Sequence, residues 1–391
     1  MTVAARSTNA VTEALLARNP FSEAFFTRES IRLAVASKEI AARFLVGGRL
    51  LAFGRGGCAT DAQHVSVEFV HPVIVGKRAL AALDLSTAFT QWAPAVSRPA
   101  DIAMGFAPAG GDAEVTRVLA GLRATGVLTL ALTGEGADFS FGPPSPDAFI
   151  DQEIMEIVYH TLWETVHVFF EHGEMGHDVG DAGFLYPYLG RERQELTGLL
   201  ESVAESIRIK ASDTADLREQ VASEQSTAIA EAATAIAAAV RAGGKVIVLG
   251  NGGSATDAND FAIDCIAHPR GLNPIPAVSL SMEAASITAI ANDIGAEAIF
   301  LRQLIALAAP NDIIVVISTS GGSANIMAAL EEAKRRGMPV VALLGYDGGE
   351  IFRRGLADFP VIVRSDYVPR IQEAQASIYH VMRDAIDVTN Q

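Results

Sequence analysis

One glycine-rich turn occurs twice in this 391-residue chain, and this repeat constrains the fold more than any other feature. The sequence GRGGCATD spans residues 54–61, and GNGGSATD spans residues 250–257. Each turn follows a short apolar run that opens on two glycines and a basic residue, Arg49 in one case and Lys245 in the other. Self-similarity of this kind predicts two copies of one domain in the chain.

Two further pairs of matching segments follow in the same order. DIAMGFAPAGGDAEV from Asp101 aligns with DIIVVISTSGGSANI from Asp312, and DQEIMEIVYH, ending at His160, aligns with RIQEAQASIYH, ending at His380. Three pairs in one order make chance similarity a poor explanation. The predicted organisation is a first domain over residues 1–170, a connector over 171–190 and a second domain over 191–391.

Short β-branched runs alternate with longer helical patterns. In the second half the runs VIVLG, IPAVSL, IIVVIS, VVALLG and FPVIV are each separated by a segment with helical spacing of apolar residues. This alternation is typical of a parallel sheet covered by helices on both faces. Helical lead-ins, roughly residues 11–46 and 191–241, precede the halves. The predicted fold class is α/β, with two tandem doubly wound parallel-sheet domains.

Composition narrows the partners that the chain can have. Half of the residues are hydrophobic, which is enough for two cores, and the net charge is −16. This charge opposes binding to nucleic acid or to anionic membranes, whereas a small anion can still be held by backbone amides. The N-terminus lacks a signal-like apolar core, and the two cysteines, Cys58 and Cys265, suit a reducing compartment. We therefore expect a cytoplasmic protein that does not enter the membrane.

The segment STSGGS, residues 318–323, stands between a predicted buried strand and a predicted helix. A helix N-terminus presents unpaired N–H groups, and glycines let the backbone approach a bound oxyanion closely. Hydroxyl side chains before a helix often serve only as caps, but capping needs one or two of the four present here. The combination favours a phosphate monoester as ligand.

Four segments together, GNGGS, ISTSGGSAN, AIANDIG and RIQEAQASIYH, resemble the SIS (sugar isomerase) domain, in particular its phosphoheptose isomerase branch. The second half is similar over nearly its whole length, and residues 40–165 are similar at lower specificity. The resemblance implies flavodoxin-like or Rossmann-like domains with a sugar-phosphate pocket and no nucleotide cofactor. The implied substrate-binding residues are Asn251, Ser254, Asp293, Ser318, Thr319, Ser320, Ser323 and Gln372, with His380 at the reacting end.

The first half retains four polar residues that the family places on two helices. They are His64 and Glu68, four residues apart, and Gln152 and His160, eight residues apart. Both spacings put a pair on one helical face, so two nitrogen and two oxygen ligands can converge on a metal such as zinc. The resemblance implies such a metal site. The competing explanation is that each histidine is a packed, hydrogen-bonded core residue.

The second half has lost part of this set. It carries Asp260 and Asp264 in place of the His and Glu, and keeps Gln372 and His380. Without the first histidine, metal binding there is less expected than in the first half.

The first half in turn lacks the hydroxyl loop. Residues 107–112 read APAGGD, and Cys58 replaces Ser254. The carboxylate of Asp112 would repel a phosphate. The first half is thus expected to be a degenerate SIS domain without the phosphate loop. We therefore expect a composite site, in which the second half binds the anion and the first half supplies acid/base and metal groups.

Aldose–ketose isomerisation moves a proton between adjacent carbons through an enediol, which requires a base and an acid. Glu68 or Asp264 is the predicted base, and His160 or His380 is the predicted acid. By the resemblance, the substrate is sedoheptulose 7-phosphate or a related ketose phosphate, and two chains form a homodimer with four SIS domains.

The alternative is a regulator that binds a sugar phosphate without catalysis, similar to the initiator-associating proteins of bacterial replication. AIANDIG and LLGYDGGE fit that group as well as the isomerases. The histidines at positions 160 and 380 favour the isomerase.

Overall fold

The computed structural model describes residues 3–74, 77–174 and 196–389. These residues group into two compact units, which we call unit A (Pro20–Asp213) and unit B (Met1–Asn19 with Thr214–Gln391). None of the helices in the described ranges is long and apolar enough to cross a bilayer.

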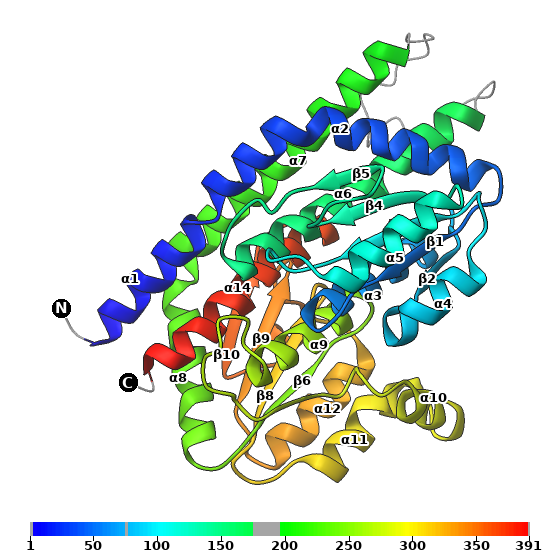
Figure 1. The fold of residues 1–391 in the computed structure, drawn as a ribbon. Coiled ribbons are helices and arrows are strands. Elements are labelled where there is room, and N and C mark those ends of the chain that lie inside the picture. The colour runs from blue at the N-terminus through cyan, green and yellow to red at the C-terminus, as the bar shows by residue number, and fades with distance from the viewer. Residues whose placement is uncertain (1–2, 75–76, 175–195, 390–391) are drawn as a thin grey trace. The chain divides into compact units, whose positions relative to one another are not determined.

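Unit A holds one five-stranded parallel sheet in the order β2-β1-β3-β4-β5 (Figure 1). Its strands are β1 (Leu50–Phe53), β2 (Ala82–Asp84), β3 (Ile102–Phe106), β4 (Leu128–Leu132) and β5 (Phe139–Phe141). Its helices are α2 (Asn19–Leu45), α3 (Gly57–Val70), α4 (Phe89–Val96), α5 (Ala113–Ala124), α6 (Ala148–Glu174) and most of α7 (Leu196–Glu224).

Unit B holds a second five-stranded parallel sheet, in the order β10-β9-β8-β6-β7 (Figure 1). Its strands are β6 (Val246–Leu249), β7 (Ala277–Ser279), β8 (Ile313–Ser318), β9 (Val340–Gly345) and β10 (Phe359–Val363). Its helices are α1 (Val3–Leu16), α8 (Ser226–Arg241), α9 (Gly253–Ile266), α10 (Ala284–Asp293), α11 (Ile299–Leu307), α12 (Ala324–Arg335), α13 (Gly349–Arg353) and α14 (Val368–Thr389).

Read from β7, the second sheet repeats the strand order of the first. In both sheets the central strands are buried along their whole length, as expected where helices cover both faces. Alternate residues of β1 enter different cores: Leu50 and Ala52 join the cluster under α2 and α6, and Leu51 and Phe53 join the cluster under α4 and α5. The predicted α/β fold class is confirmed.

The repeated turn has the same geometry in both units. A Cβ atom on Gly54 would lie 2.3 Å from the carbonyl oxygen of Cys58, and one on Gly250 would lie 2.2 Å from that of Ser254. Gly56 and Gly252 precede the helix with φ of 57° and 59°, a region that favours glycine. In each unit the glycines therefore let the chain turn directly from the end of a strand into a helix.

The unit boundaries differ from the predicted domain boundaries at both lead-in helices. Helix α1 belongs to unit B, where Val11 and Leu15 are buried in a core shared with α8 and α14, and Thr12 donates to Ser226 (2.9 Å). The first part of α7 belongs to unit A, where Val203 and Ile207 are buried. Helical periodicity predicted α7 and the last part of α1, whose start at Val3 lies before the predicted lead-in. Periodicity also does not reveal which core an apolar face joins.

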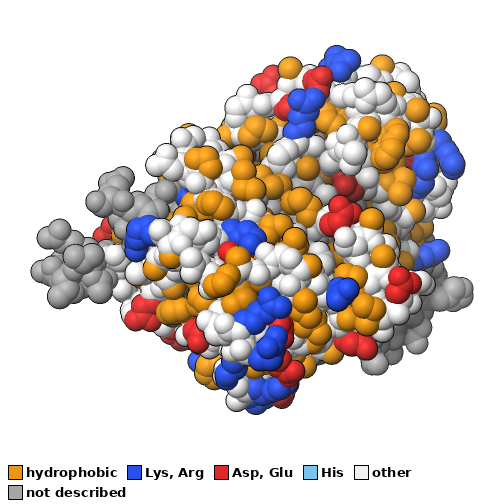
Figure 2. Space-filling view, turned by 90° about the horizontal axis from the view of Figure 1, so that it is seen from below, with side chains coloured by type: hydrophobic (Ala, Val, Ile, Leu, Met, Phe, Trp, Pro, Cys, Tyr) orange, Lys and Arg blue, Asp and Glu red, His pale blue; other side chains and the backbone are white. Residues whose placement is uncertain are grey.

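Basic and acidic side chains are interspersed on the face shown in Figure 2, with hydrophobic side chains between them. In unit B, for example, Glu332 pairs with Arg335 and Arg336, and Arg354 pairs with Glu331. Such pairing reduces the local positive charge that a polyanion would require.

The placement of α1 predicts unequal effects of substituting two adjacent leucines. Leu15 is fully buried and Leu16 is 38% exposed. Leu15→Ala should lower the free energy of unfolding by about 2–5 kcal/mol, because it leaves a cavity in the core of unit B. Leu16→Ala should lower it by less than about 1 kcal/mol. Urea denaturation measures both, and equal effects would contradict the packing of α1 in unit B.

Candidate functional site

The predicted phosphate loop lies in unit B, at the carboxyl end of β8 and the start of α12. Ser318 and Ser320 accept hydrogen bonds from the backbone of Gly321 (3.1 Å) and Gly322 (3.3 Å). Ser323 is the N-cap residue of α12, yet its side chain makes no capping hydrogen bond. Its hydroxyl therefore remains available, beside amides that a helix leaves unpaired at its N-terminus.

The repeated turn of unit B reaches the same helix start. The amide groups of Asn251 and Asn325 exchange two hydrogen bonds of 3.0 Å, which join the turn before α9 to the first turn of α12. Ser254 is buried in the first turn of α9. The sequence analysis did not include Asn325 among the site residues. Its position two residues after Ser323, in the first turn of the helix, could have indicated it.

Two other predicted substrate residues lie on helices α10 and α14 of unit B. Asp293 is exposed at the C-terminal end of α10, where Asn292 donates to its carboxylate (2.8 Å). Gln372 is buried in the first half of α14. Their contact with a bound sugar stays a prediction, whereas the hydroxyl loop and Asn251 are brought together by the fold.

In unit A, charged residues stand at the positions of the cap residue Ser323 and of the Asn251–Asn325 pair. The carboxylate of Asp112 caps α5 by accepting hydrogen bonds from the backbone N–H groups of Glu114 (2.8 Å) and Val115 (2.9 Å). Arg55 and Glu114, at the positions equivalent to Asn251 and Asn325, form an ion pair. A protein carboxylate thus already occupies the amides that would hold an anion, which gives a physical reason for the expected loss of the phosphate site.

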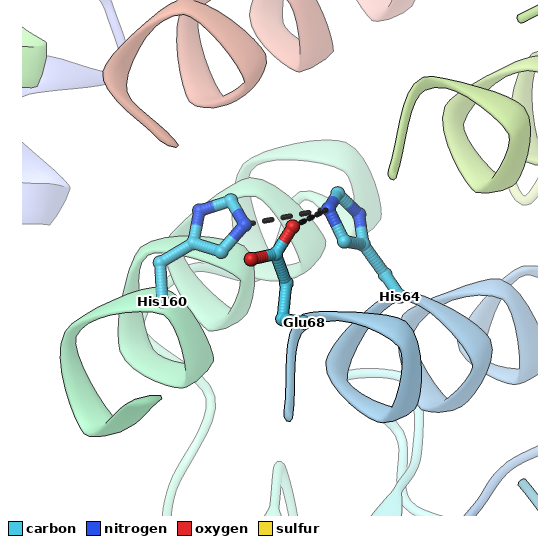
Figure 3. A group of neighbouring side chains, drawn as sticks. All are labelled: His64, Glu68 and His160. Atoms are coloured by element: carbon cyan, nitrogen blue, oxygen red, sulfur yellow. Dashed lines mark hydrogen bonds and ion pairs between the residues drawn. The ribbon is translucent and has the colours of Figure 1, made fainter. Parts of the chain in front are cut away.

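Three of the four predicted metal ligands converge in unit A, on α3 and α6. His64, Glu68 and His160 are all buried, and their ligand atoms lie within 4.8 Å of one another (Figure 3). The Nε2 atoms of His64 and His160 are 3.4 Å apart, and Nε2 of His64 lies 3.8 Å from Oε1 of Glu68. The helical spacings in the sequence therefore aim these side chains at one point.

This geometry suits a tetrahedral metal. Ligand nitrogens at about 2.0–2.1 Å from zinc lie roughly 3.3 Å from each other, close to the separation of the two Nε2 atoms. Two imidazoles and one carboxylate are a donor set that zinc accepts.

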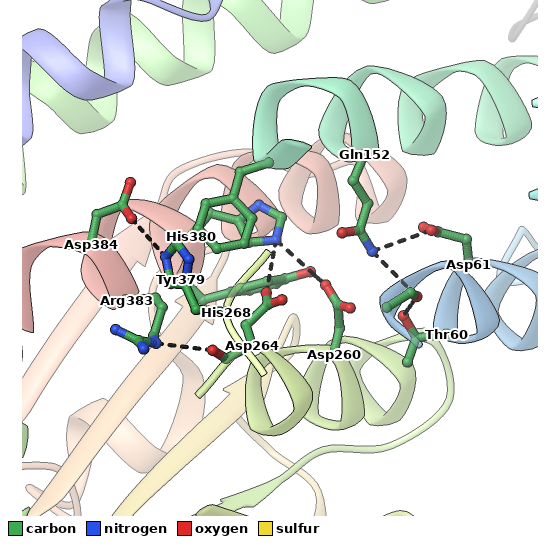
Figure 4. A network of polar contacts seen from close by, with 12 residues as sticks. Thr60, Asp61, Gln152, Asp260, Asp264, His268, Tyr379, His380, Arg383 and Asp384 are labelled. Atoms are coloured by element: carbon green, nitrogen blue, oxygen red, sulfur yellow. Dashed lines mark hydrogen bonds and ion pairs between the residues drawn. The ribbon is translucent and has the colours of Figure 1, made fainter. Parts of the chain in front are cut away.

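The fourth predicted ligand, Gln152, makes other contacts. Its Nε2 donates to Asp61 (3.2 Å) and to the backbone oxygen of Gly57 (3.4 Å), one turn nearer the start of α3 (Figure 4). Eight helical residues separate Gln152 from His160 by about 12 Å along the axis. The sequence predicted that Gln152 and His160 share one face of a helix. Residue spacing could not predict that the side-chain amide of Gln152 turns toward Asp61.

The equivalent cluster of unit B consists of Asp260, Asp264 and His380, all buried (Figure 4). Nε2 of His380 lies 3.4 Å from Oδ2 of Asp260 and 3.3 Å from Oδ2 of Asp264. Tyr379, which the sequence did not single out, donates its hydroxyl to Asp260 (2.9 Å). Burial and the nearby charge of Asp260 raise the pKa of Asp264 to about 7, despite the hydrogen bond with His380.

Known proteins with similar sequences match part of this chain. The family model of the SIS domain matches residues 211–345. Phosphoheptose isomerase of Trichlorobacter lovleyi is 41% identical over 172 residues, which are 44% of this chain and 87% of that protein. Phosphoheptose isomerase of a Geobacter species is 44% identical over 165 residues, 42% of this chain and 85% of that protein.

One solved structure shares the fold over the whole length. The C-terminal domain of glucosamine-fructose-6-phosphate aminotransferase from Francisella tularensis aligns over 96% of both chains with a TM-score of 0.62 and 9% identity. At that identity the likeness concerns the fold alone. The two sheets, the hydroxyl loop and the 87% coverage of a relative 41% identical lead to one conclusion: the chain belongs to the SIS domain family.

Proposed function

We propose that this protein is a sugar-phosphate aldose–ketose isomerase acting on a ketose phosphate such as sedoheptulose 7-phosphate. The observation that carries the proposal is the hydroxyl loop at the N-terminus of α12, whose Ser323 side chain is left free of capping. Relatives named phosphoheptose isomerase and a buried acid/base cluster in each unit support the same reaction class.

The loop serves as an anchor for the phosphate group. Backbone amides, hydroxyls and the helix dipole favour an oxyanion at this position. Binding energy from the phosphate, which does not react, then positions the carbonyl carbon and its neighbour for proton transfer. An anchor of this kind accounts for selection of phosphorylated sugars.

Proton transfer requires a base and an acid from the two clusters. In unit A, Glu68 removes the proton from carbon and His160 protonates the enediol. In unit B, Asp264 and His380 are the equivalent pair, and a carboxyl with a pKa of about 7 is matched to general-base work near neutral pH. That the loop of unit B and the acid/base groups of unit A serve one substrate stays a prediction from the sequence.

The ligand set of unit A is part of the proposal. In a metal-bound form, His64, Glu68 and His160 would hold a divalent metal, with zinc the best match to two imidazoles and a carboxylate. Because an Nε2 atom bound to zinc carries no proton, Asp264 and His380 would then be the proton-transfer pair. When bound there, zinc supplies Lewis-acid stabilisation of charge that develops on the substrate oxygens. Finer parts of the proposal are a cytoplasmic location and a homodimer with four SIS domains.

The acid/base assignment predicts loss of turnover without unfolding. Glu68→Gln and His160→Ala should each lower kcat for sedoheptulose 7-phosphate at least 100-fold, because each removes a proton-transfer group. Circular dichroism should show an intact fold, and His71→Ala, at an exposed histidine, is the control. Asp264→Asn and His380→Ala report whether unit B also transfers protons. Unchanged kcat in both unit A variants would reject the assignment.

The anchor predicts weaker binding when the loop hydroxyls are removed. Ser320→Ala combined with Ser323→Ala should raise the Kd for the sugar phosphate at least tenfold, because hydrogen bonds to a charged group contribute about 1.5–3 kcal/mol each. Stability should change little, since Ser323 does not cap its helix. Calorimetric titration measures Kd, with Ser223→Ala at an exposed hydroxyl as control. An unaltered Kd would refute the anchor.

The metal site predicts a stoichiometry that depends on His64. Protein dialysed against zinc should retain about one equivalent per chain, and His64→Ala should lose it, because two ligands do not close a zinc site. Plasma mass spectrometry counts the metal, and His71→Ala again serves as control. Equal zinc content in His64→Ala and the unaltered protein would place the metal elsewhere.

A further inference from the structure

A second glycine-rich loop lies against the phosphate loop of unit B. This loop, residues 345–349 with the sequence GYDGG, connects β9 to α13; we call it the bracing loop. The backbone N–H of Gly345 donates to the oxygen of Thr319 (3.0 Å). Just beyond the loop, the N–H of Ile351 donates to the oxygen of Gly321 (2.9 Å). Two residues of the phosphate loop are thus held by backbone bonds from this segment.

The two loops touch so closely that side chains are excluded. A Cβ atom on Gly349 would lie 2.2 Å from the carbonyl oxygen of Ser320, and one on Gly321 would lie 2.3 Å from that of Gly348. A Cβ on Gly345 would lie 2.6 Å from the oxygen of Thr319. These contacts are with backbone atoms, so a side chain at any of the three positions must change how the two loops pack.

The bracing loop is itself held in an unusual conformation. Tyr346 has a φ of 51°, a left-handed conformation that costs a non-glycine residue about 1–2 kcal/mol. Its half-buried side chain packs against the core that includes Ile371 of α14. Asp347 accepts a hydrogen bond from the N–H of Gly349 (3.0 Å), and this bond lowers the pKa of its carboxyl. Surrounding contacts therefore over-determine the loop, as is common at binding sites.

Unit A, whose phosphate site is lost, lacks such close packing at the equivalent strand ends. There a cavity of about 300 Å³ is lined by Gly110 and Gly111 on one side and by Thr133, Gly134 and Glu135 on the other. Tight packing of the second loop thus accompanies the hydroxyl loop of unit B, and an open space accompanies the capped loop of unit A.

We propose that the bracing loop is a positioning element of the anion site: it holds residues 318–323 in the shape that receives a phosphate before the phosphate arrives. Preorganisation of this kind strengthens binding because little conformational freedom remains to be lost when the ligand binds. The inference rests on the proposed phosphate site and adds Gly345, Gly348, Gly349 and Asp347 to it, none of which needs to touch the ligand.

The test compares two glycine substitutions that differ in what the new methyl group meets. Gly349 and Gly355 have φ of 58° and 59°, so alanine imposes the same backbone strain at both. A Cβ on Gly355 has no atom within 4 Å, whereas one on Gly349 meets the phosphate loop. Gly349→Ala should raise the Kd for inorganic phosphate at least tenfold, and Gly355→Ala should leave it within twofold. Equal Kd values in the two variants would overturn the inference.

A second pair of variants tests the inference if Gly349→Ala does not fold. Asp347 is largely exposed, so Asp347→Ala removes the acceptor for the N–H of Gly349 without a steric conflict. It should weaken phosphate binding severalfold, and Asp347→Asn, which keeps an acceptor oxygen, should restore it. An unchanged Kd in Asp347→Ala would also count against the inference. If the unaltered protein binds no phosphate, the proposed function fails instead.

Discussion

The start of α12 is the physical feature on which the proposed chemistry depends. Parallel strands bring each following helix to the carboxyl edge of the sheet, and a helix begins with amides that have no internal partner. In unit B the cap residue, Ser323, accepts from none of these amides, and the N–H of Ile326 donates to the side chain of Asn325 (2.9 Å). In unit A the carboxylate of Asp112 consumes them. The choice of cap residue therefore distinguishes the proposed phosphate site of unit B from the capped helix of unit A.

The two units differ at equivalent pairs of residues. The neutral Asn251–Asn325 pair of unit B corresponds to the charged Arg55–Glu114 pair of unit A. His64, opposite His160, corresponds to Asp260, which accepts a hydrogen bond from the hydroxyl of Tyr379. In the buried clusters these contacts matter because a buried polar group without a partner is costly. Both clusters thus remain packed, while their donor sets suit different tasks.

Much of the fold and part of the candidate site could be predicted from the sequence, because helices and strands impose a regular spacing on residue types. The glycine turns, the strand runs and the positions of His64, Glu68 and His160 follow from local geometry that residue types impose. The turn of Gln152 toward Asp61, the Asn325 partner of Asn251 and the brace of Gly349 against Ser320 could not be read. These contacts join segments far apart in the chain, and a single sequence does not say which distant surfaces meet.

The exchange of lead-in helices has a consequence for how the protein is made. Helix α1 leaves the ribosome well before the segments from residue 221 onward, which form the core that buries Leu15. Unit A likewise waits for Ile207 before its core is complete. Synthesis thus leaves an apolar stripe of α1 uncovered until the later segments of unit B, which form its packing surface, have been made.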